Sequence, residues 1–266
     1  MPTPHIIARD PRLREIVWND LTALTSRERL ADLVMPAPWL AGSLVAAYLG
    51  WFAFALVLSF FFFLAGLRQV HDAYHHNLGL ERRANALLLA VLSALMLGSM
   101  HAVRITHLHH HKHCLEEEDV EASSARLRWW QALVLGPLFP IRLHMAAIRL
   151  GRKRDKQWIA IELAVTLAIV CTAIAIDSRV LRYHVIAMAL GQCGTAFFAV
   201  WTVHHDCERH DRFARTLRNR LKSAVALDMF FHVEHHLFPK VPTRHLPRLA
   251  ERLDRVAPEL TELRVY

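Results

Sequence analysis

Three clusters of histidines have the residue type and the spacing that suit metal binding. They are His71, His75 and His76, then His107, His110 and His111, and finally His232, His235 and His236. Residues three or four positions apart lie on one face of a helix, so each cluster can direct two or three imidazoles at one point. Neutral imidazole is the commonest metal ligand and suits iron, copper, zinc and nickel. About eight or nine nitrogens exceed the four ligands of one zinc ion, so the clusters predict two metals.

The neighbours of these clusters have simpler explanations beside the functional ones. Asp72 and Glu234 lie inside clusters, where a carboxylate can orient imidazoles through hydrogen bonds or can be an ordinary solvated helix position. The acidic run at 116–119 is expected to form a solvated turn. A local metal-storage tract would be continuous and repetitive, whereas these clusters are separated by long apolar segments. A bound metal centre is therefore the better interpretation of the clusters.

The composition indicates a membrane protein. The 266 residues are 54% hydrophobic, with a net charge of +8 and 19 histidines, and the mean hydropathy is +0.21. So much apolar surface excludes a disordered chain, and four cysteines are too few for a disulfide scaffold. The basic residues show no nucleic-acid-binding signature, so we expect no nucleic acid partner.

Apolar segments predict the elements that position the histidines. Residues 36–49 and 52–76 predict two helices joined by a tight turn at Gly50. Residues 158–176 and 183–203 predict a second pair of spans. We therefore expect an all-α, multi-pass membrane protein with about four transmembrane helices and a cytoplasmic helical cap that holds the metals.

Two further segments are expected to contact the bilayer or the spans. Residues 84–103 are long enough to span it, or to pack against the first pair of helices. Residues 129–150 alternate apolar and basic residues, which predicts an amphipathic helix on the membrane surface.

The distribution of Lys and Arg predicts the orientation. Because cytoplasmic loops collect these residues, both termini and all three clusters should face the cytoplasm. The predicted organisation is listed by range: a single domain over 1–266, with a cytoplasmic N-terminal segment at 1–34, spans within 36–203, a cytoplasmic loop at 104–156 and a cytoplasmic C-terminal segment at 204–266.

The pattern HxxxHH, HxxHH and HxxHH around paired spans resembles the integral-membrane fatty acid desaturase superfamily. The third cluster and its tail, residues 232–239 (HVEHHLFP), are especially similar, and the resemblance covers about residues 50–245. It implies a di-iron centre that uses O₂ as co-substrate. It also implies one more histidine ligand near the end of the last span, which is either His204 or His205.

This resemblance implies oxidation of an unactivated C–H bond in a long-chain fatty acid or acyl lipid, by desaturation or hydroxylation. The acyl tail is expected between Phe60–Phe63 and 185–201. The superfamily also contains carotenoid ring ketolases and hydroxylases and alkene-forming fatty acid decarboxylases, and these outcomes stay open. A membrane metal transporter is the alternative from another class, although it predicts ionisable ligands inside the spans.

The resemblance also implies an electron donor and a membrane in which the enzyme acts. We expect an external electron donor, a ferredoxin or similar protein, and a bacterial inner membrane as the site of action. The basic residues Arg215, Arg218, Arg220 and Lys222 are candidates for a donor-docking surface, although membrane topology is the favoured explanation for most of them.

Overall fold

A computed structural model describes residues 11–208 and 213–258. Within these residues the chain is all helical, apart from one isolated bridge between Thr216 and Phe231. Four helical segments are long and apolar enough to cross a membrane: Ser26–Tyr48, Phe52–Tyr74, Lys153–Ala175 and Arg179–His204. A segment of 23 residues is about 34 Å long, which matches a bilayer core of about 30 Å. The expected all-α architecture with four spans is confirmed.

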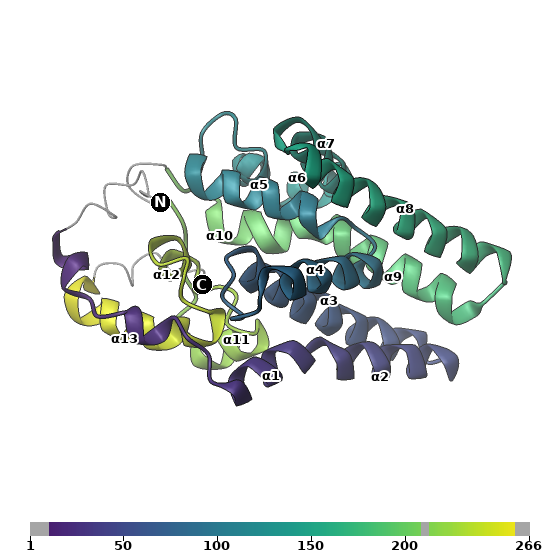
Figure 1. Cartoon of the computed structure of the whole chain (residues 1–266), viewed down its shortest axis with the longest axis horizontal. Coiled ribbons are helices and arrows are strands. Elements are labelled where there is room, and N and C mark those ends of the chain that lie inside the picture. The colour runs from purple at the N-terminus through teal and green to yellow at the C-terminus, as the bar shows by residue number, and fades with distance from the viewer. Residues whose placement is uncertain (1–10, 209–212, 259–266) are drawn as a thin grey trace.

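The first two spans form a hairpin. Helices α1 (Ser26–Val34) and α2 (Pro36–Tyr48) together make the first span, and α3 (Phe52–Tyr74) returns beside them (Figure 1). Gly50 makes the turn with a φ of 81°, a backbone conformation that glycine adopts without strain. Inside the hairpin, Ser43 and Ser59 hydrogen-bond at 2.6 Å. This bond satisfies two hydroxyls where no water is available.

The apolar block predicted at 84–103 is not one straight helix. Helix α4 (Arg82–Met96) ends at Leu97, and α5 (Met100–His113) leaves it at an angle of 111°. The Ser99 side chain caps α5 by accepting from the amide of Ala102 at 3.1 Å. The bend turns α5 away from α4, and α5 carries the whole second histidine cluster.

The amphipathic helix predicted at 129–150 is likewise broken. Helix α6 (Trp129–Val134) and α7 (Leu138–Leu150) are separated by a turn at Gly136. A Cβ at Gly136 would lie 2.1 Å from the carbonyl oxygen of Cys193, so only glycine permits this close approach to the last span. The exposed apolar residues of both helices agree with a position at the membrane surface, and they include Trp129, Leu138 and Ile141.

The last pair of spans brings the chain back to the histidines. Helix α8 (Lys153–Ala175) is followed by α9 (Arg179–Thr195), which starts four residues earlier than the span predicted at 183. A π-helical segment, η5 (Ala196–Trp201), and the short α10 (Thr202–His204) complete this span. The π turn changes the rotation of the helix just before His204, and such turns are frequent at functional sites.

The C-terminal part covers one end of the spans. Helices α11 (Arg220–Val225), α12 (His232–Leu237) and α13 (Leu246–Val256) lie away from the turns that join α2 to α3 and α8 to α9 (Figure 1). Short 3₁₀ segments accompany them: η2 (Pro11–Glu15), η3 (Asn19–Leu21), η4 (Glu121–Arg126) and η6 (Thr243–His245). Leu249 and Leu253 of α13 share a buried core with Leu13 and Leu21. The N- and C-terminal segments thus fold together, while residues 1–10 and 259–266 of the predicted cytoplasmic ends lie outside the described residues.

Candidate metal centre

Nine of the eleven histidines predicted as ligands lie in two compact groups. The first group is His71, His75, His107, His111 and His235; the second group is His110, His204, His232 and His236. Helix α5 supplies both groups because His107 and His111 lie about 40° apart around the helix, whereas His110 lies about 60° from His107 and about 100° from His111. Helix α12 divides in the same way, since His235 joins the first group and the other two join the second. One helical turn of three histidines therefore serves two sites.

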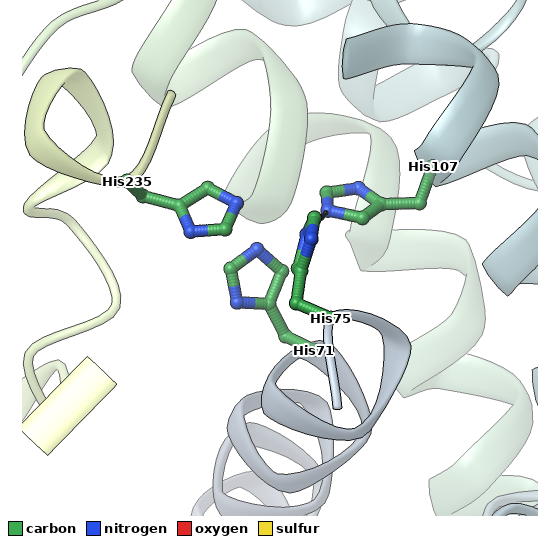
Figure 2. Close-up of side chains that lie close together, drawn as sticks. All are labelled: His71, His75, His107 and His235. Carbon is green, nitrogen blue, oxygen red and sulfur yellow. Dashed lines mark hydrogen bonds between the residues drawn. The ribbon is translucent and has the colours of Figure 1, made fainter. Parts of the chain in front are cut away.

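In the first group, the imidazoles converge from α3, α5 and α12. Figure 2 shows His71, His75, His107 and His235 with their rings directed toward a common centre. The Nε2 atoms of His75 and His107 are 3.0 Å apart, and those of His111 and His235 are 2.8 Å apart. Ligand atoms of the four residues in Figure 2 all lie within 4.8 Å of one another. That spacing suits four nitrogens around one metal ion.

The second group is almost entirely buried. The Nε2 atom of His110 lies 3.1 Å from that of His204 and 3.3 Å from that of His236. His232 closes the group, with its Nε2 atom 2.9 Å from that of His204. Burial and the neighbouring imidazoles hold the pKa of both His232 and His236 well below the usual range, so these rings are neutral and can bind metal.

The ring nitrogens of the second group converge in a way that suits a cation. The Nδ1 of His110 donates to the Asp119 carboxylate at 2.7 Å, and the Nδ1 of His204 donates to the Phe213 carbonyl at 2.8 Å. Because a carbonyl only accepts, the His204 Nδ1 holds the proton and its Nε2 carries the lone pair. Burial lowers the pKa of His110, but Cys114 and Asp119 outweigh it and hold the pKa well above its usual range, so without a metal the His110 Nε2 also holds a proton, which it donates to the His204 Nε2 at 3.1 Å. Metal binding would release that proton and leave both Nε2 atoms directed at the ion. The residues present therefore fit a bound metal.

Carboxylates outside the predicted set support these ligands. Asp119 also accepts hydrogen bonds from the amides of Leu115 and Ala122, at 2.9 and 3.1 Å. Burial alone would raise the pKa of Asp119, but His110 and the two amides outweigh it and lower the pKa to about 2. Glu121 accepts from the Nδ1 of His107 at 2.9 Å, and burial raises its pKa to about 7.

The interpretation of 116–119 as a solvated turn was wrong for Asp119, whose side chain is buried. The turn folds back under α5 because the Asp119 carboxylate accepts the Leu115 amide just beyond the end of that helix. The position of Asp119 shortly after the second cluster is the feature of the sequence that could have indicated its contact with His110.

Two predicted ligands lie outside both groups. Helix α3 ends at Tyr74, so His76 has left the helix, with a φ of 60°, and is exposed. His205 stacks on Trp201 with ring centroids 4.0 Å apart, and its Nδ1 donates to the Trp201 carbonyl at 2.8 Å. Of the two candidates at the end of the last span, the geometry brings His204 to the metal centre.

Asp72 and Glu234 contact residues of the C-terminal part and no imidazole. Asp72 accepts from the amide and the hydroxyl of Thr243, at 2.9 and 3.0 Å. Glu234 accepts from the Thr216 hydroxyl at 2.7 Å and pairs with Arg218 at 2.7 Å. Asp72 thus ties α3 to the segment that follows α12, and Glu234 ties α12 to the segment that precedes α11. Arg218 is thereby used inside the protein and is not a free docking residue.

The contacts of Cys114 and of Glu162 were not predicted from the sequence. The Cys114 Sγ lies 4.0 Å from the His110 Nε2, and its side chain is buried. Glu162, a carboxylate within the third span, accepts hydrogen bonds from His101 Nδ1 at 2.6 Å and from the Ser99 hydroxyl at 2.5 Å. A carboxylate inside an apolar span is a recognisable signal, because such residues are rare in spans and find partners.

The match to a protein family agrees with this geometry. The protein family described as "Fatty acid desaturase" matches residues 27–265 of the chain. The chain belongs to the fatty acid desaturase family. No curated protein matches it. Membership identifies an integral-membrane oxidoreductase that acts on fatty acyl chains. The two histidine groups of this desaturase-family protein fit a di-iron site and are consistent with iron binding.

Proposed function

We propose that this desaturase-family protein is an O₂-dependent di-iron enzyme that oxidises an unactivated C–H bond of a long acyl chain, by desaturation or hydroxylation. One observation carries the proposal. The Nε2 atom of His110 lies 3.1 Å from that of His204 and 3.3 Å from that of His236, directly beside the first group of converging imidazoles. When bound, two reduced irons supply the capacity to activate O₂ and remove hydrogen from such a bond.

The first group would hold one iron and the second group the other. Asp119 and Glu121 keep protons on the Nδ1 atoms of His110 and His107, which leaves each Nε2 lone pair for the metal. Phe213 does the same for His204 through its carbonyl. These partners fix the ring orientations before any metal arrives.

The apolar cavity beside the groups supports an acyl substrate. It has a volume of about 650 Å³ and is lined by Phe60, Phe63 and Leu67 of α3 and by Leu190 of α9. These side chains bind a hydrocarbon and exclude water from it. The lining overlaps the region expected from the sequence for the acyl tail.

The proposal also includes the orientation in the membrane and the electron donor. The metal centre and both termini face the cytoplasm of a bacterial inner membrane, as the distribution of Lys and Arg favours. A ferredoxin or similar donor supplies the electrons. A metal transporter would place its ligands along a path through the spans. In the described residues, the first and second groups instead lie at one end of the spans and in the segments beyond them.

The proposal is tested by lipid analysis of a host that expresses the protein. Mass spectrometry should detect acyl chains with two hydrogens fewer or one oxygen more than in the host alone. The control is a host that expresses His110→Ala at an equal level, which should give the host profile. Oxidised carotenoids with unchanged acyl chains would instead favour the carotenoid alternative. Transport of metal without any O₂-dependent product would contradict the enzyme assignment.

A further inference from the structure

One cysteine lies inside the second histidine group. The Cys114 side chain is fully buried, and its Sγ atom lies 4.0 Å from the Nε2 atom of His110. One donor atom each of Cys114, His110, His204 and His236 all lie within 4.8 Å of one another. These residues come from the end of α5, from the end of the last span and from α12. The thiol is therefore part of a cluster that three separate elements build.

The end of α5 brings the thiol to this position. Cys114 follows His110 by four residues, which is about 40° around a helix and about 6 Å along it, so both side chains lie on one face. The helix ends at His113, and Leu115 has a φ of 64°, a left-handed conformation that is unfavourable for a residue with a side chain. The Asp119 carboxylate holds this turn by accepting from the Leu115 amide at 2.9 Å. Asp119 thus fixes both the His110 ring and the turn directly after Cys114.

The surroundings of Cys114 differ from those of an ordinary buried cysteine. A free cysteine in a protein core usually packs as a small apolar side chain. The hydrophobic clusters that the described residues form do not include Cys114. Its Sγ atom instead lies near the His110 Nε2 and 3.8 Å from the Phe213 carbonyl oxygen, which also accepts from the His204 Nδ1. The thiol therefore faces a ligand nitrogen and the carbonyl that orients another ligand.

The distances around the thiol suit a shared metal ion better than a hydrogen bond. A thiol is a weak donor, and its contacts of 3.8 and 4.0 Å are long. An ion bound to a sulfur at about 2.3 Å and to a nitrogen at about 2.1 Å holds these two atoms at most about 4.4 Å apart. The 4.0 Å between the Cys114 Sγ and the His110 Nε2 lies within this limit. A single ion between them can therefore contact both atoms.

We propose that Cys114 is a thiolate ligand of the ion in the second group. The ligands implied by the sequence are all histidines, so the thiolate adds a donor of another chemical class. Binding breaks the S–H bond, releases the proton to solvent and forms a sulfur–metal bond without a change of oxidation state. This inference rests on the proposed function for the presence of metal ions, but not for the reaction. The second group then offers as many donors as the first: Cys114, His110, His204, His232 and His236.

A thiolate in one group makes the two ions unequal. The first group consists of imidazoles, which carry no charge when they bind a metal. The Cys114 thiolate brings a negative charge to the second group and donates electron density to its ion. Charge and donation of this kind lower the reduction potential of a metal site. The ion of the second group would therefore be the harder of the two to reduce.

X-ray absorption at the iron edge tests the ligand without any substitution. The iron-loaded, unchanged protein should show about one sulfur neighbour for every two irons, at a longer distance than the nitrogens, as thiolate and imidazole ligands of zinc differ. A shell of nitrogen and oxygen alone, in protein that holds its iron, overturns the inference and leaves the proposed function standing. A protein that binds no iron contradicts the proposed function itself.

Cobalt substitution assigns the sulfur to Cys114. Cobalt(II) bound to a thiolate has an intense near-ultraviolet absorption band that imidazole ligands do not give. The cobalt-loaded protein should show this band, and Cys114→Ser should lose it. Cys171→Ser is the matched control and should keep the band, because Cys171 is exposed on α8. A band of full strength in Cys114→Ser would overturn the inference, and the iron-edge measurement decides the case if this variant does not fold.

The strength of metal binding gives a further readout. Serine keeps the approximate size of cysteine but is a poor metal ligand, so Cys114→Ser should release the ion of the second group to a chelator at least about 10-fold faster. Release of the other ion should change less, because the first group keeps all its imidazoles. Cys171→Ser should release both ions at the rates of the unchanged protein. Unchanged release of both ions from Cys114→Ser would contradict a bond between Cys114 and the metal.

Discussion

The two histidine groups differ in the carboxylates that accept hydrogen bonds from the Nδ1 atoms of their ligands. In the second group, the carboxylate behind His110 is Asp119, which is buried, ionised and fixed by two backbone amides. In the first group, the carboxylate behind His107 is Glu121, whose pKa burial raises to about 7. The other oxygen of Glu121 is buried without a hydrogen-bond partner. The second group is thus rigidly prepared for a metal, whereas the first relies more on the metal for its order.

This difference teaches that two sites from the same helices need not be equivalent. An ionised carboxylate behind a ligand increases the basicity of the imidazole and strengthens its bond to the metal. We therefore expect the second group to bind its ion more tightly than the first group. The following predictions test this comparison.

The largest effect is expected from removal of a ligand in either group. His110→Ala and His235→Ala should each lower turnover by about 100-fold or more, because ligands of one centre act as a unit. Each variant should also lose iron, which elemental analysis of the purified protein measures. His109→Ala is the control, since His109 stacks on His113 outside both groups. Full activity in the two ligand variants would contradict the metal assignment.

The next effect is expected at Asp119. Asp119→Asn removes the charge behind His110 and keeps the size of the side chain, so metal affinity or activity should fall by about 10- to 100-fold. The rate at which a chelator removes iron from the variant measures the affinity. Retention equal to that of the unchanged protein would show that the charge of Asp119 has no part in metal binding.

A smaller effect is expected at Glu121. Glu121→Gln should reduce iron retention by about 10-fold or less, because the Glu121 carboxylate carries less charge than that of Asp119. The same chelator assay gives the comparison directly. A greater loss in Glu121→Gln than in Asp119→Asn would reverse the order of the two groups.

The smallest effect is expected at the two histidines that the structure places outside the groups. His76→Ala and His205→Ala should keep their iron and most of their activity, because neither ring lies with the other imidazoles. Iron content and turnover are measured as for the ligand variants. Loss of one iron in either variant would add that residue to the centre and change the comparison.

Much of the fold follows from the sequence because the bilayer imposes simple rules. Long apolar segments and the turn at Gly50 locate α2 and α3 to within two residues. The first span nevertheless begins at Ser26, ten residues before the predicted start, because the polar helix α1 continues it into the segment predicted as cytoplasmic. The break between α4 and α5 could not be predicted, because the Ser99 cap depends on partners from α8. The break at Gly136 depends likewise on contact with the carbonyl of Cys193 in the last span. Both breaks come from tertiary contacts that periodicity does not contain.

The candidate site was predictable to a similar extent. Helical spacing correctly placed His107 and His111 together. It was wrong in directing His110 at the same point, because His110 lies with His204 and His236 in the second group. It failed for His76, because the helix ends at Tyr74. It also could not choose between His204 and His205, since the π-helical segment before them alters the rotation of the chain. The division of the clusters between two groups depends on three helices meeting in space.

The iron content of the purified protein tests the central claim most directly. The chain is expressed in an iron-supplied host, purified in detergent, and analysed for metals and protein on the same sample. The two groups of converging imidazoles predict close to two irons per chain, with about one lost in His236→Ala. A fully active preparation with one iron or none per chain would contradict the two-metal centre.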